Sequence, residues 1–283
     1  MRAGHDVTAL VRHKEKARRV AKRGAHPVIG DLKFPESFAA ALDGQDGYVH
    51  AAFDARSGRG PTVERVALEA MIAAAQRPRP GTLRRFVIYT SGVWILGRKP
   101  DPAAEDAPIN PIEHVAWRPG QEQFVLAAAS DSLRTIVVRP GLVYGGGSGL
   151  ICDLFAAASN GLVRVVGDGN NRWPLVYDRD LADLYTRLVA RDEASGIYHA
   201  NDEGDERVND LVDAIKPHVA VKPDVRYVPI EEARLKMGAY ADALALDQVV
   251  RSPRARALGW APNLRSVSGN AARLLEEWRA SRN

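Results

Sequence analysis

Short apolar runs alternate with amphipathic segments along the first half of the chain. The apolar runs have the length and composition of buried β-strands and occupy residues 6–11, 27–29, 47–52, 86–89 and 135–138. The segments with helical periodicity are residues 14–23, 34–42, 63–76 and 121–129. Strands and helices that alternate at this spacing predict βαβ units, and therefore an α/β fold built on a doubly wound parallel sheet.

After Gly149 the pattern becomes less regular. Further helical patterns cover residues 150–159, 208–215 and 267–279, and short strand patterns cover 163–166, 197–200 and 225–228. A Pro- and Asp-rich stretch at 99–111 predicts a loop. We expect a larger part made of residues 1–149, with 171–200 returning to it. Residues 150–170 and 201–283 would form a smaller α/β part.

Composition excludes several classes of protein. The 283 residues are 46% hydrophobic and 26% charged, which is typical of a globular chain and not of a disordered one. The formal net charge of +4 is too small to indicate nucleic-acid binding. Basic residues gather at 12–23, and a solvated helix face over residues 14–23 is the better interpretation. The single cysteine, Cys152, and the absence of a bilayer-length apolar run predict a cytoplasmic protein.

The stretch from Thr135 to Gly145 suggests where a ligand would bind. It runs from an apolar strand into a Pro-Gly turn and then into glycines. In an open parallel sheet, ligands bind beyond the carboxyl ends of the strands, so the loops after these strands are the candidate site.

Six short motifs, taken in order and spacing, carry a family resemblance. They are Gly30-Asp31-Leu32, Val49-His-Ala-Ala52, Tyr89-Thr-Ser91, Val138-Arg-Pro-Gly-Leu-Val-Tyr-Gly145, Val176-Tyr-Asp-Arg-Asp-Leu-Ala182 and Leu258-Gly-Trp-Ala-Pro262. Together they resemble the extended short-chain dehydrogenase/reductase family, the NAD-dependent epimerase/dehydratase group. The resemblance covers nearly the whole chain. It implies a Rossmann-like fold, with residues 1–149 as the dinucleotide-binding domain and the smaller part as the substrate-binding domain.

The resemblance also implies roles in binding NAD or NADP. Asp31 would accept a hydrogen bond from the adenine amino group, and Ala51 and Ala52 would let the backbone approach the cofactor. The remaining implied cofactor contacts are Tyr89, Pro140, Leu142 and Val143. Arg12 ends a strand where NADP-using members place a cation, so NADP is slightly favoured. The alternative is that Arg12 simply begins a basic helix.

One family feature is absent from this sequence. The glycine-rich turn that approaches the pyrophosphate lies between the first strand and the first helix of the family. Met1 falls near the end of that helix. We therefore expect that the true start lies upstream of Met1, or that the chain is a truncated form. The alternative is a chain that folds poorly and binds dinucleotide weakly.

The catalytic motif is altered as well. The family uses Tyr-x-x-x-Lys with an upstream Ser or Thr, and the matching positions hold His114, Arg118 and Gly92, with Ser91 just before. His114 could replace the phenol as acid or base, because its unperturbed pKa is about 6.5. Pro119 predicts that the helix begins at this point, so His114 and Arg118 need not share a helical face. The alternative is that both are ordinary loop and helix-start residues.

The remaining candidates are fewer. By resemblance, Asn171 and Arg172 would contact the substrate. The histidines and the one cysteine have no metal-ligand spacing, so we predict no metal site. The predicted function is an NAD(P)-dependent epimerase/dehydratase-type oxidoreductase or isomerase acting on a small polar substrate, with a nucleotide-sugar as one candidate. The alternative is a non-catalytic dinucleotide-binding redox sensor or regulatory protein. We expect no nucleic-acid or membrane partner, and a homodimer is possible.

Overall fold

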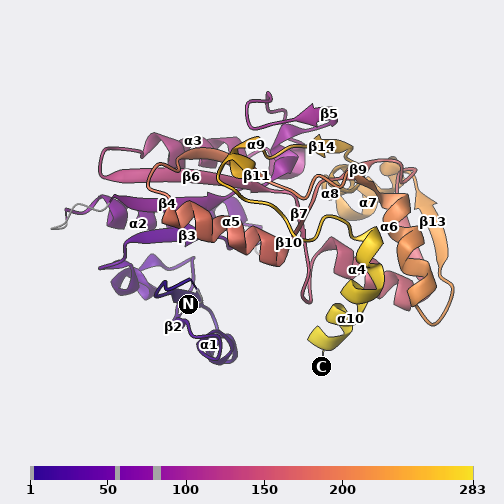
Figure 1. The fold of residues 1–283 in the computed structure, drawn as a ribbon, viewed down its shortest axis with the longest axis horizontal. Coiled ribbons are helices and arrows are strands. Elements are labelled where there is room, and N and C mark those ends of the chain that lie inside the picture. Colours follow the sequence, from indigo (N-terminus) through magenta and orange to yellow (C-terminus); the bar gives the residue numbers. More distant parts are fainter. Residues whose placement is uncertain (1–2, 55–57, 79–83, 283) are drawn as a thin grey trace. The chain divides into compact units, whose positions relative to one another are not determined.

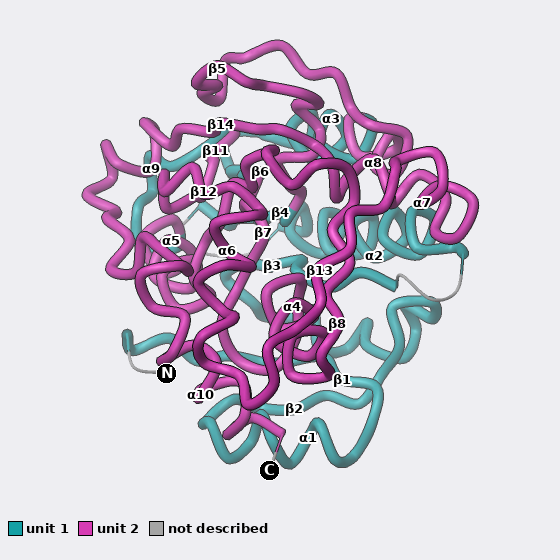
Figure 2. Tube along the Cα trace, turned by 90° about the vertical axis from the view of Figure 1, so that its right-hand side faces the viewer, with its two compact units in different colours: residues 1–90, 120–137, 189–196 teal, residues 91–119, 138–188, 197–283 magenta. Residues whose placement is uncertain are grey.

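The computed structural model describes residues 3–54, 58–78 and 84–282 of the chain (Figure 1). Met1, on which the expectation about the start of the chain rests, lies outside them. The chain divides into two compact units (Figure 2). Unit 1 comprises residues 1–90, 120–137 and 189–196, and unit 2 comprises residues 91–119, 138–188 and 197–283.

Unit 1 begins with a parallel strand pair. β1 (Thr8–Val11) pairs with β2 (His26–Ile29), and α1 (Lys14–Ala21) connects them. Ala17 is the buried residue of α1, whereas its Lys and Arg side chains are exposed. The basic segment is thus the solvated helix face that its pattern indicates.

The rest of unit 1 is built on a second parallel pairing. β3 (Gly47–His50) pairs with β4 (Arg85–Thr90), and α2 (Gly60–Gln76) makes the connection. Val87, Ile88 and Tyr89 of β4 are fully buried. The four-stranded sheet has the order β11-β6-β4-β3, in which β6 (Leu133–Pro140) runs from unit 1 into unit 2. α3 (Arg118–Ala127) precedes β6. The predicted α/β fold with a parallel sheet is confirmed.

Unit 2 contains the end of β6, β11 (Gly196–Ala200) except for its first residue, and four two-stranded pairings. The parallel pairs are β7 (Leu142–Tyr144) with β10 (Leu175–Tyr177), β8 (Leu162–Val166) with β13 (Asp224–Val228), and β5 (Lys99–Ala103) with β14 (Gln248–Val250). The antiparallel pair is β9 (Arg172–Trp173) with β12 (Glu206–Arg207). The helices are α4 (Leu150–Ser159), α5 (Asp178–Ala190), α6 (Val208–Ile215), α7 (Ile230–Met237), α8 (Tyr240–Leu244), α9 (Pro253–Ala257) and α10 (Ala271–Ser281).

The core of unit 2 lies among α4, α6 and α10. Phe155 of α4 and Trp278 of α10 pack with their ring centroids 6.1 Å apart. Leu211 of α6 and Val267 are fully buried in the same cluster. These helices carry the predicted apolar faces, so the core follows from the amphipathic pattern.

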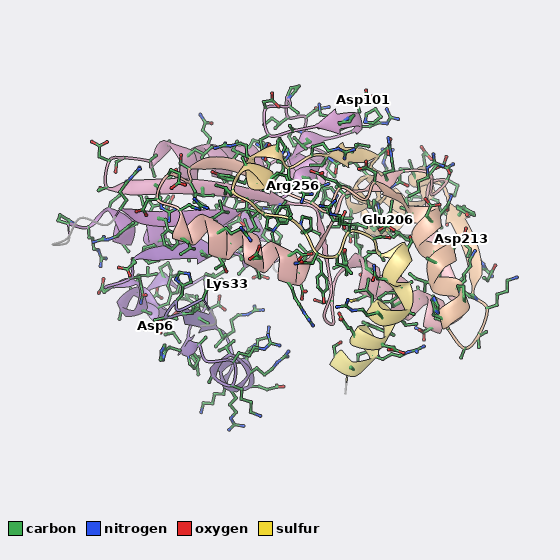
Figure 3. The ribbon with its side chains drawn as sticks, in the orientation of Figure 1. Asp6, Lys33, Asp101, Glu206, Asp213 and Arg256 are labelled. Atoms are coloured by element: carbon green, nitrogen blue, oxygen red, sulfur yellow. The ribbon has the colours of Figure 1, made fainter. Side chains whose placement is uncertain are left out.

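Two carboxylates, buried Asp180 and half-buried Glu206, hold the irregular segment before α10. Asp180 accepts hydrogen bonds from the backbone N–H groups of Asn263 and Leu264, each at 3.0 Å. Glu206, labelled in Figure 3, accepts from the N–H groups of Val267 and Ser268, at 2.7 and 2.8 Å. A segment outside helices and strands thereby has its backbone donors satisfied by side chains.

Two expectations about local structure are wrong. Residues 34–42 do not form one helix but two short 3₁₀ helices, Pro35–Ser37 and Ala39–Leu42, which meet at Phe38. The Ser37 hydroxyl bonds to the Phe34 carbonyl at 2.6 Å, a local bond that competes with a regular helix. The stretch at 99–111 is not all loop, because its first residues form β5, whose prolines are tolerated in a short strand paired with β14 alone.

Three findings bear on domains, membranes and metals. The functional division into a cofactor and a substrate domain stays a prediction, since the compact units describe packing only.

No helix within residues 3–54, 58–78 and 84–282 has the length and apolar character needed to cross a bilayer. In that same part of the chain, no three His, Cys, Asp or Glu side chains converge as metal ligands would.

Candidate functional site

Four of the five predicted cofactor residues of unit 1 follow the carboxyl ends of parallel strands; the fifth, Tyr89, lies within β4. Arg12 follows β1, Asp31 follows β2, and Ala51 and Ala52 follow β3. An ion pair of 3.0 Å between Lys33 and Asp54 joins the loops after β2 and β3. The loops that carry Asp31, Ala51 and Ala52 are therefore held together.

The local structure of these residues suits a ligand that approaches the backbone. The Asp31 carboxylate accepts the N–H of Lys33 at 3.0 Å, and the N–H of Asp31 bonds to the Ser37 hydroxyl at 3.0 Å. This turn fixes the direction of the Asp31 side chain. Ala51 and Ala52 are exposed, and their small side chains leave the backbone accessible. Within the described residues they fit the edge of a dinucleotide site.

Tyr89 differs from the others because its side chain is fully buried. Its hydroxyl donates a hydrogen bond of 2.8 Å to the carboxylate of Glu64, which is itself buried on α2. The phenol thus belongs to the core of unit 1. A cofactor contact by Tyr89 stays a prediction, and the buried position leaves no free hydroxyl for it.

Three further implied cofactor contacts, Pro140, Leu142 and Val143, lie in unit 2. Pro140 ends β6 and is buried, whereas Val143 of β7 is 38% exposed. The N–H of Leu142 bonds to the Pro174 carbonyl at 2.7 Å. A Cβ added at Gly141 would lie 2.5 Å from the same carbonyl oxygen, so glycine is required for this close approach of two backbones.

Ser91 and Gly92 follow β4 at the start of unit 2. The N–H of Ser91 bonds to the Val138 carbonyl at 2.8 Å, which fixes the backbone. The Ser91 hydroxyl oxygen is buried, and it has no hydrogen-bond partner among the described residues. A Cβ at Gly92 would meet only the Pro140 carbonyl oxygen, at 3.9 Å. An unpaired buried hydroxyl costs free energy, so it indicates a place where a ligand can supply the partner.

His114 and Arg118 do not share one helix. His114 lies in the 3₁₀ turn η4 (Glu113–Val115), and α3 begins at Arg118. This confirms the helix start that Pro119 predicts. The Arg118 guanidinium lies over the Trp117 ring, 4.5 Å from its centroid.

The His114 imidazole belongs to an aromatic cluster with Trp94 and Tyr240. Its ring centroid lies 5.9 Å from that of Trp94, in η3 (Val93–Leu96), and 5.2 Å from that of Tyr240 on α8. Partial burial lowers the pKa of His114 below its usual value, and the positive charge of Arg118 lowers it further. His114 is therefore neutral at pH 7 and has one exposed side.

Asn171 and Arg172 have protein partners in unit 2. The Asn171 amide donates to the carbonyls of Leu244 and Leu246, at 3.0 and 3.3 Å. Arg172 binds the Asp247 carboxylate with two nitrogens, at 2.9 and 2.8 Å. Both side chains organise β9 and its neighbours, and their predicted substrate contacts stay predictions.

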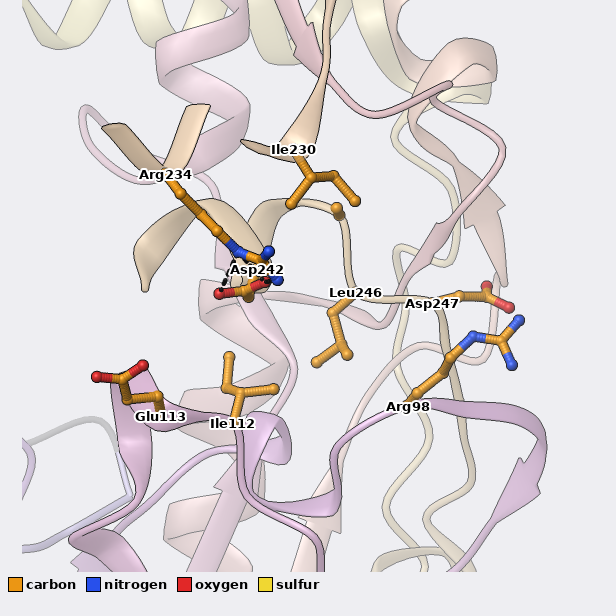
Figure 4. A pocket seen from close by; sticks show the side chains of 9 residues that line it. Arg98, Ile112, Glu113, Ile230, Arg234, Asp242, Leu246 and Asp247 are labelled. Carbon is orange, nitrogen blue, oxygen red and sulfur yellow. Dashed lines mark hydrogen bonds and ion pairs between the residues drawn. The ribbon is translucent and has the colours of Figure 1, made fainter. Parts of the chain in front are cut away.

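Sequence reasoning missed a charged cavity of about 320 Å³ in unit 2 (Figure 4). In it Arg234 and Asp242 point toward each other as an ion pair, and Arg98 points toward Asp247. Bonding to Arg172 lowers the pKa of Asp247. The lining residues come from positions 98 to 247 and form no sequence motif, so only the folded chain brings them together.

The comparison with protein families decides the class. Residues 1–150, which are more than half of the 283, match the family model described as NAD(P)H-binding. The chain belongs to this NAD(P)H-binding family. The resemblance to extended short-chain dehydrogenases is thereby confirmed, as is the expectation of NAD or NADP as cofactor.

Curated relatives of this NAD(P)H-binding protein include two with named reactions. An uncharacterized protein of Schizosaccharomyces pombe is 27% identical over 93% of this chain and 88% of its own. A sterol-4-alpha-carboxylate 3-dehydrogenase of Dictyostelium discoideum is 25% identical over 70% of this chain and 64% of its own. A 4-hydroxy-2-methyl-3-oxo-4-farnesyl-3,4-dihydroquinoline-1-oxide ketoreductase of Stigmatella aurantiaca is 26% identical over 82% of this chain and 71% of its own.

Solved structures share the fold. A human epimerase family protein in complex with NADPH has a TM-score of 0.77 at 18% identity and covers 96% of this chain and 99% of its own. A UDP-glucose 4-epimerase of Thermus thermophilus in complex with NAD has a TM-score of 0.78 at 17% identity. It covers 98% of this chain and 92% of its own. At these identities the likeness concerns the Rossmann-like fold alone.

Proposed function

We propose that this chain is an NAD(P)-dependent oxidoreductase or isomerase, of the epimerase/dehydratase type, in which His114 exchanges a proton with a small polar substrate. The observation that carries the proposal is the position of the His114 ring beside Trp94 and Tyr240, where its ring nitrogens have no hydrogen-bond partner among the described residues. Partial burial and the nearby Arg118 lower its pKa and so favour the neutral form. A neutral imidazole open to a ligand is a competent general base.

The chemistry divides between cofactor and chain. A bound dinucleotide supplies the hydride acceptor or donor. When a substrate alcohol is oxidised, His114 accepts the hydroxyl proton, and the positive charge of Arg118 opposes protonation of the imidazole and so keeps it a base. The unpartnered Ser91 hydroxyl supports a hydrogen bond to the substrate oxygen. Exposed Ala51 and Ala52 and the ordered Asp31 turn support the cofactor edge.

The charged cavity supports a polar group on the substrate. Arg98 and Glu113 line it, and the described residues supply neither with an ion pair. Among solved structures of the same fold is a UDP-glucose 4-epimerase of Thermotoga maritima in complex with UDP-glucose, so a nucleotide-sugar is one candidate. The named curated relatives act on a sterol carboxylate and a farnesyl quinoline, which are polar only in part.

Arg12 supports NADP over NAD. It is exposed at the end of β1 and pairs with no acidic side chain in the described residues. We expect Arg12→Ala to raise the Kd of NADPH about tenfold and to leave that of NADH unchanged, because only NADPH carries the 2′-phosphate. Titration by NAD(P)H fluorescence measures both, with Arg18→Ala on the exposed face of α1 as the matched control. Equal Kd values in wild type and Arg12→Ala would contradict the assignment.

The test of turnover is a pH profile. Alcohols, among them UDP-glucose, are offered with NADP⁺, and reduction is followed at 340 nm. We expect kcat/KM to rise with pH and then level off, because His114 must be neutral to accept the proton. The apparent pKa of this rise should lie below about 6.5, the usual value for histidine. His114→Asn should lower kcat by about 10²–10⁴-fold and abolish this acid limb. Unchanged activity in His114→Asn would refute the role of His114.

A non-catalytic dinucleotide sensor is the second candidate. The replacement of Tyr and Lys by His114 and Arg118, and their separation into two helical elements, favour it. It predicts NADPH binding without turnover across the substrate panel. His114→Asn would then leave every measurable property except stability unchanged.

A further inference from the structure

A second cavity of about 260 Å³ in unit 2 is apolar, in contrast to the charged one. Nine of its twelve lining residues are Ala, Val, Leu or Trp. They come from α4, β8, β9, α6 and α8, and include Leu154, Ala157, Val165, Trp173 and Leu244. Its two charged lining residues, Asp153 and Arg164, are exposed and so mark the rim.

This cavity offers a ligand very few hydrogen bonds. The indole N–H of Trp173 already donates to the Leu244 carbonyl at 3.0 Å. The other polar side chain of the lining that lies away from the rim is Tyr240. Its hydroxyl has no hydrogen-bond partner among the described residues. A nucleotide base or a sugar needs several donors and acceptors, whereas a hydrocarbon chain needs none.

Tyr240 joins the apolar cavity to the candidate catalytic residue. It lines the cavity, and its ring lies 5.2 Å from that of His114, centroid to centroid. Trp94 closes the cluster at 6.1 Å from Tyr240. A ligand that fills the cavity and extends past Tyr240 therefore brings its next atoms to His114.

We propose that this cavity holds the hydrocarbon chain of an amphiphilic substrate whose reacting hydroxyl or carbonyl lies at His114. This deepens, and rests on, the function proposed above. The volume is slightly below the about 300–1,000 Å³ of pockets that enclose a whole drug-sized ligand, so the cavity holds a part of the substrate. The polar end of the same molecule lies at the Tyr240 side. Of the two charged rim residues, Arg164 forms no ion pair with the described residues and favours a carboxylate, whereas Asp153 does not.

A chain-length series tests the proposal without requiring turnover. Straight-chain carboxylates from butanoate to dodecanoate are titrated by calorimetry, below the concentrations at which they aggregate. The Kd should fall about fourfold per added methylene, or about 0.8 kcal/mol, until the cavity is full, and then level off. A Kd that does not depend on chain length would overturn the proposal.

Two substitutions on α4 give a matched pair. Ala157→Phe fills the cavity and should weaken decanoate at least tenfold while leaving butanoate unchanged. Ser159→Phe adds the same ring to an exposed position of the same helix and should change neither. If Ala157→Phe does not fold, Leu162→Ala enlarges the cavity instead and should move the plateau to longer chains. Two results would refute a hydrocarbon occupant. One is equal decanoate affinity in Ala157→Phe and Ser159→Phe. The other is a loss of UDP-glucose binding in Ala157→Phe alone.

These outcomes separate the two proposals. Chain-length dependence without turnover leaves the apolar site in place and removes the enzymatic function. Turnover that ignores both chain length and Ala157→Phe supports the enzymatic function and removes the apolar site.

Discussion

The carboxyl group of Asp202 provides a quantitative test of the structure. Asp202 is 2% exposed in unit 2, and one of its oxygens accepts the N–H of Gly204 at 3.0 Å. The other lies 3.2 Å from the Tyr144 hydroxyl, which is also 3.1 Å from the Leu264 carbonyl. The Tyr144 hydroxyl has one proton, but the Asp202 carboxylate and the Leu264 carbonyl are both acceptors. If Asp202 is protonated, its carboxyl O–H donates to the Tyr144 oxygen, and the Tyr144 hydroxyl donates to the Leu264 carbonyl.

The magnitude follows from the pKa. Burial, and then the nearby Glu206 carboxylate, raise the pKa of Asp202 from 3.8 to about 7. A rise of this size corresponds to about 4 kcal/mol, at about 1.36 kcal/mol per unit. The folded state holds the proton more tightly than the unfolded state, so this group lowers stability as pH rises from about 4 to 7. Above pH 7 the full penalty applies.

Asp202→Asn removes the penalty and keeps the hydrogen bonds. The amide oxygen accepts from Gly204, and the amide nitrogen donates to Tyr144. We expect the variant and wild type to have equal free energies of unfolding near pH 4, with the variant more stable by up to about 4 kcal/mol at pH 8. Urea unfolding at several pH values measures both.

The difference between variant and wild type isolates Asp202 from other titrating groups. His199, whose pKa burial lowers to about 4, destabilises the fold as pH falls below about 6.5 and contributes equally to both proteins. Asp192→Asn at an exposed site is the control and should give a difference near zero throughout. A stability difference that stays flat from pH 5 to 8, or that favours wild type at pH 8, would refute a protonated Asp202.

Two further substitutions test contacts of unit 2. Gly141→Ala should destabilise by about 1–3 kcal/mol, because its methyl group would lie 2.5 Å from the Pro174 carbonyl oxygen. Thermal unfolding measures this loss of stability. Gly120→Ala is the control, because a Cβ at Gly120 would meet no atom within 4 Å. An unchanged Tm of Gly141→Ala would contradict the close approach of the Gly141 and Pro174 backbones. Arg172→Ala should cost about 1.5–3 kcal/mol, because it leaves the partly buried Asp247 carboxylate without its two-nitrogen partner. Arg172→Lys should recover only part of this, and wild-type stability with lost substrate binding would instead make Arg172 a substrate ligand.

The fold could be predicted from sequence because its strongest signals are local. The alternation of strands and helices identified the parallel sheet, and the helices at 150–159 and 208–215 match α4 and α6 residue for residue. The failures were places where tertiary contacts decide. β5 forms only because β14, about 150 residues later, pairs with it, and no local pattern at Lys99–Ala103 indicates that partner.

The candidate site was predictable only where family motifs lie. Asp31, Ala51 and Ala52 follow strands as expected, and Pro119 located the start of α3. Tyr240 could not be found in this way, because its importance comes from a ring contact with His114 across more than a hundred residues. Arg172 carries the type of side chain expected for a substrate ligand, but a single sequence does not indicate that Asp247 engages it.

The carboxylates of Asp180 and Glu206 have a consequence for how the chain opens locally. The amides of Asn263, Leu264, Val267 and Ser268 are protected by side chains rather than by a helix or strand ladder. Their exchange with solvent therefore requires only that hydrogen bonds to two side chains break, and it does not require unfolding of a whole element. This segment leads into α10, so these side-chain bonds anchor the start of the last helix, whereas the helix itself is held by its apolar face.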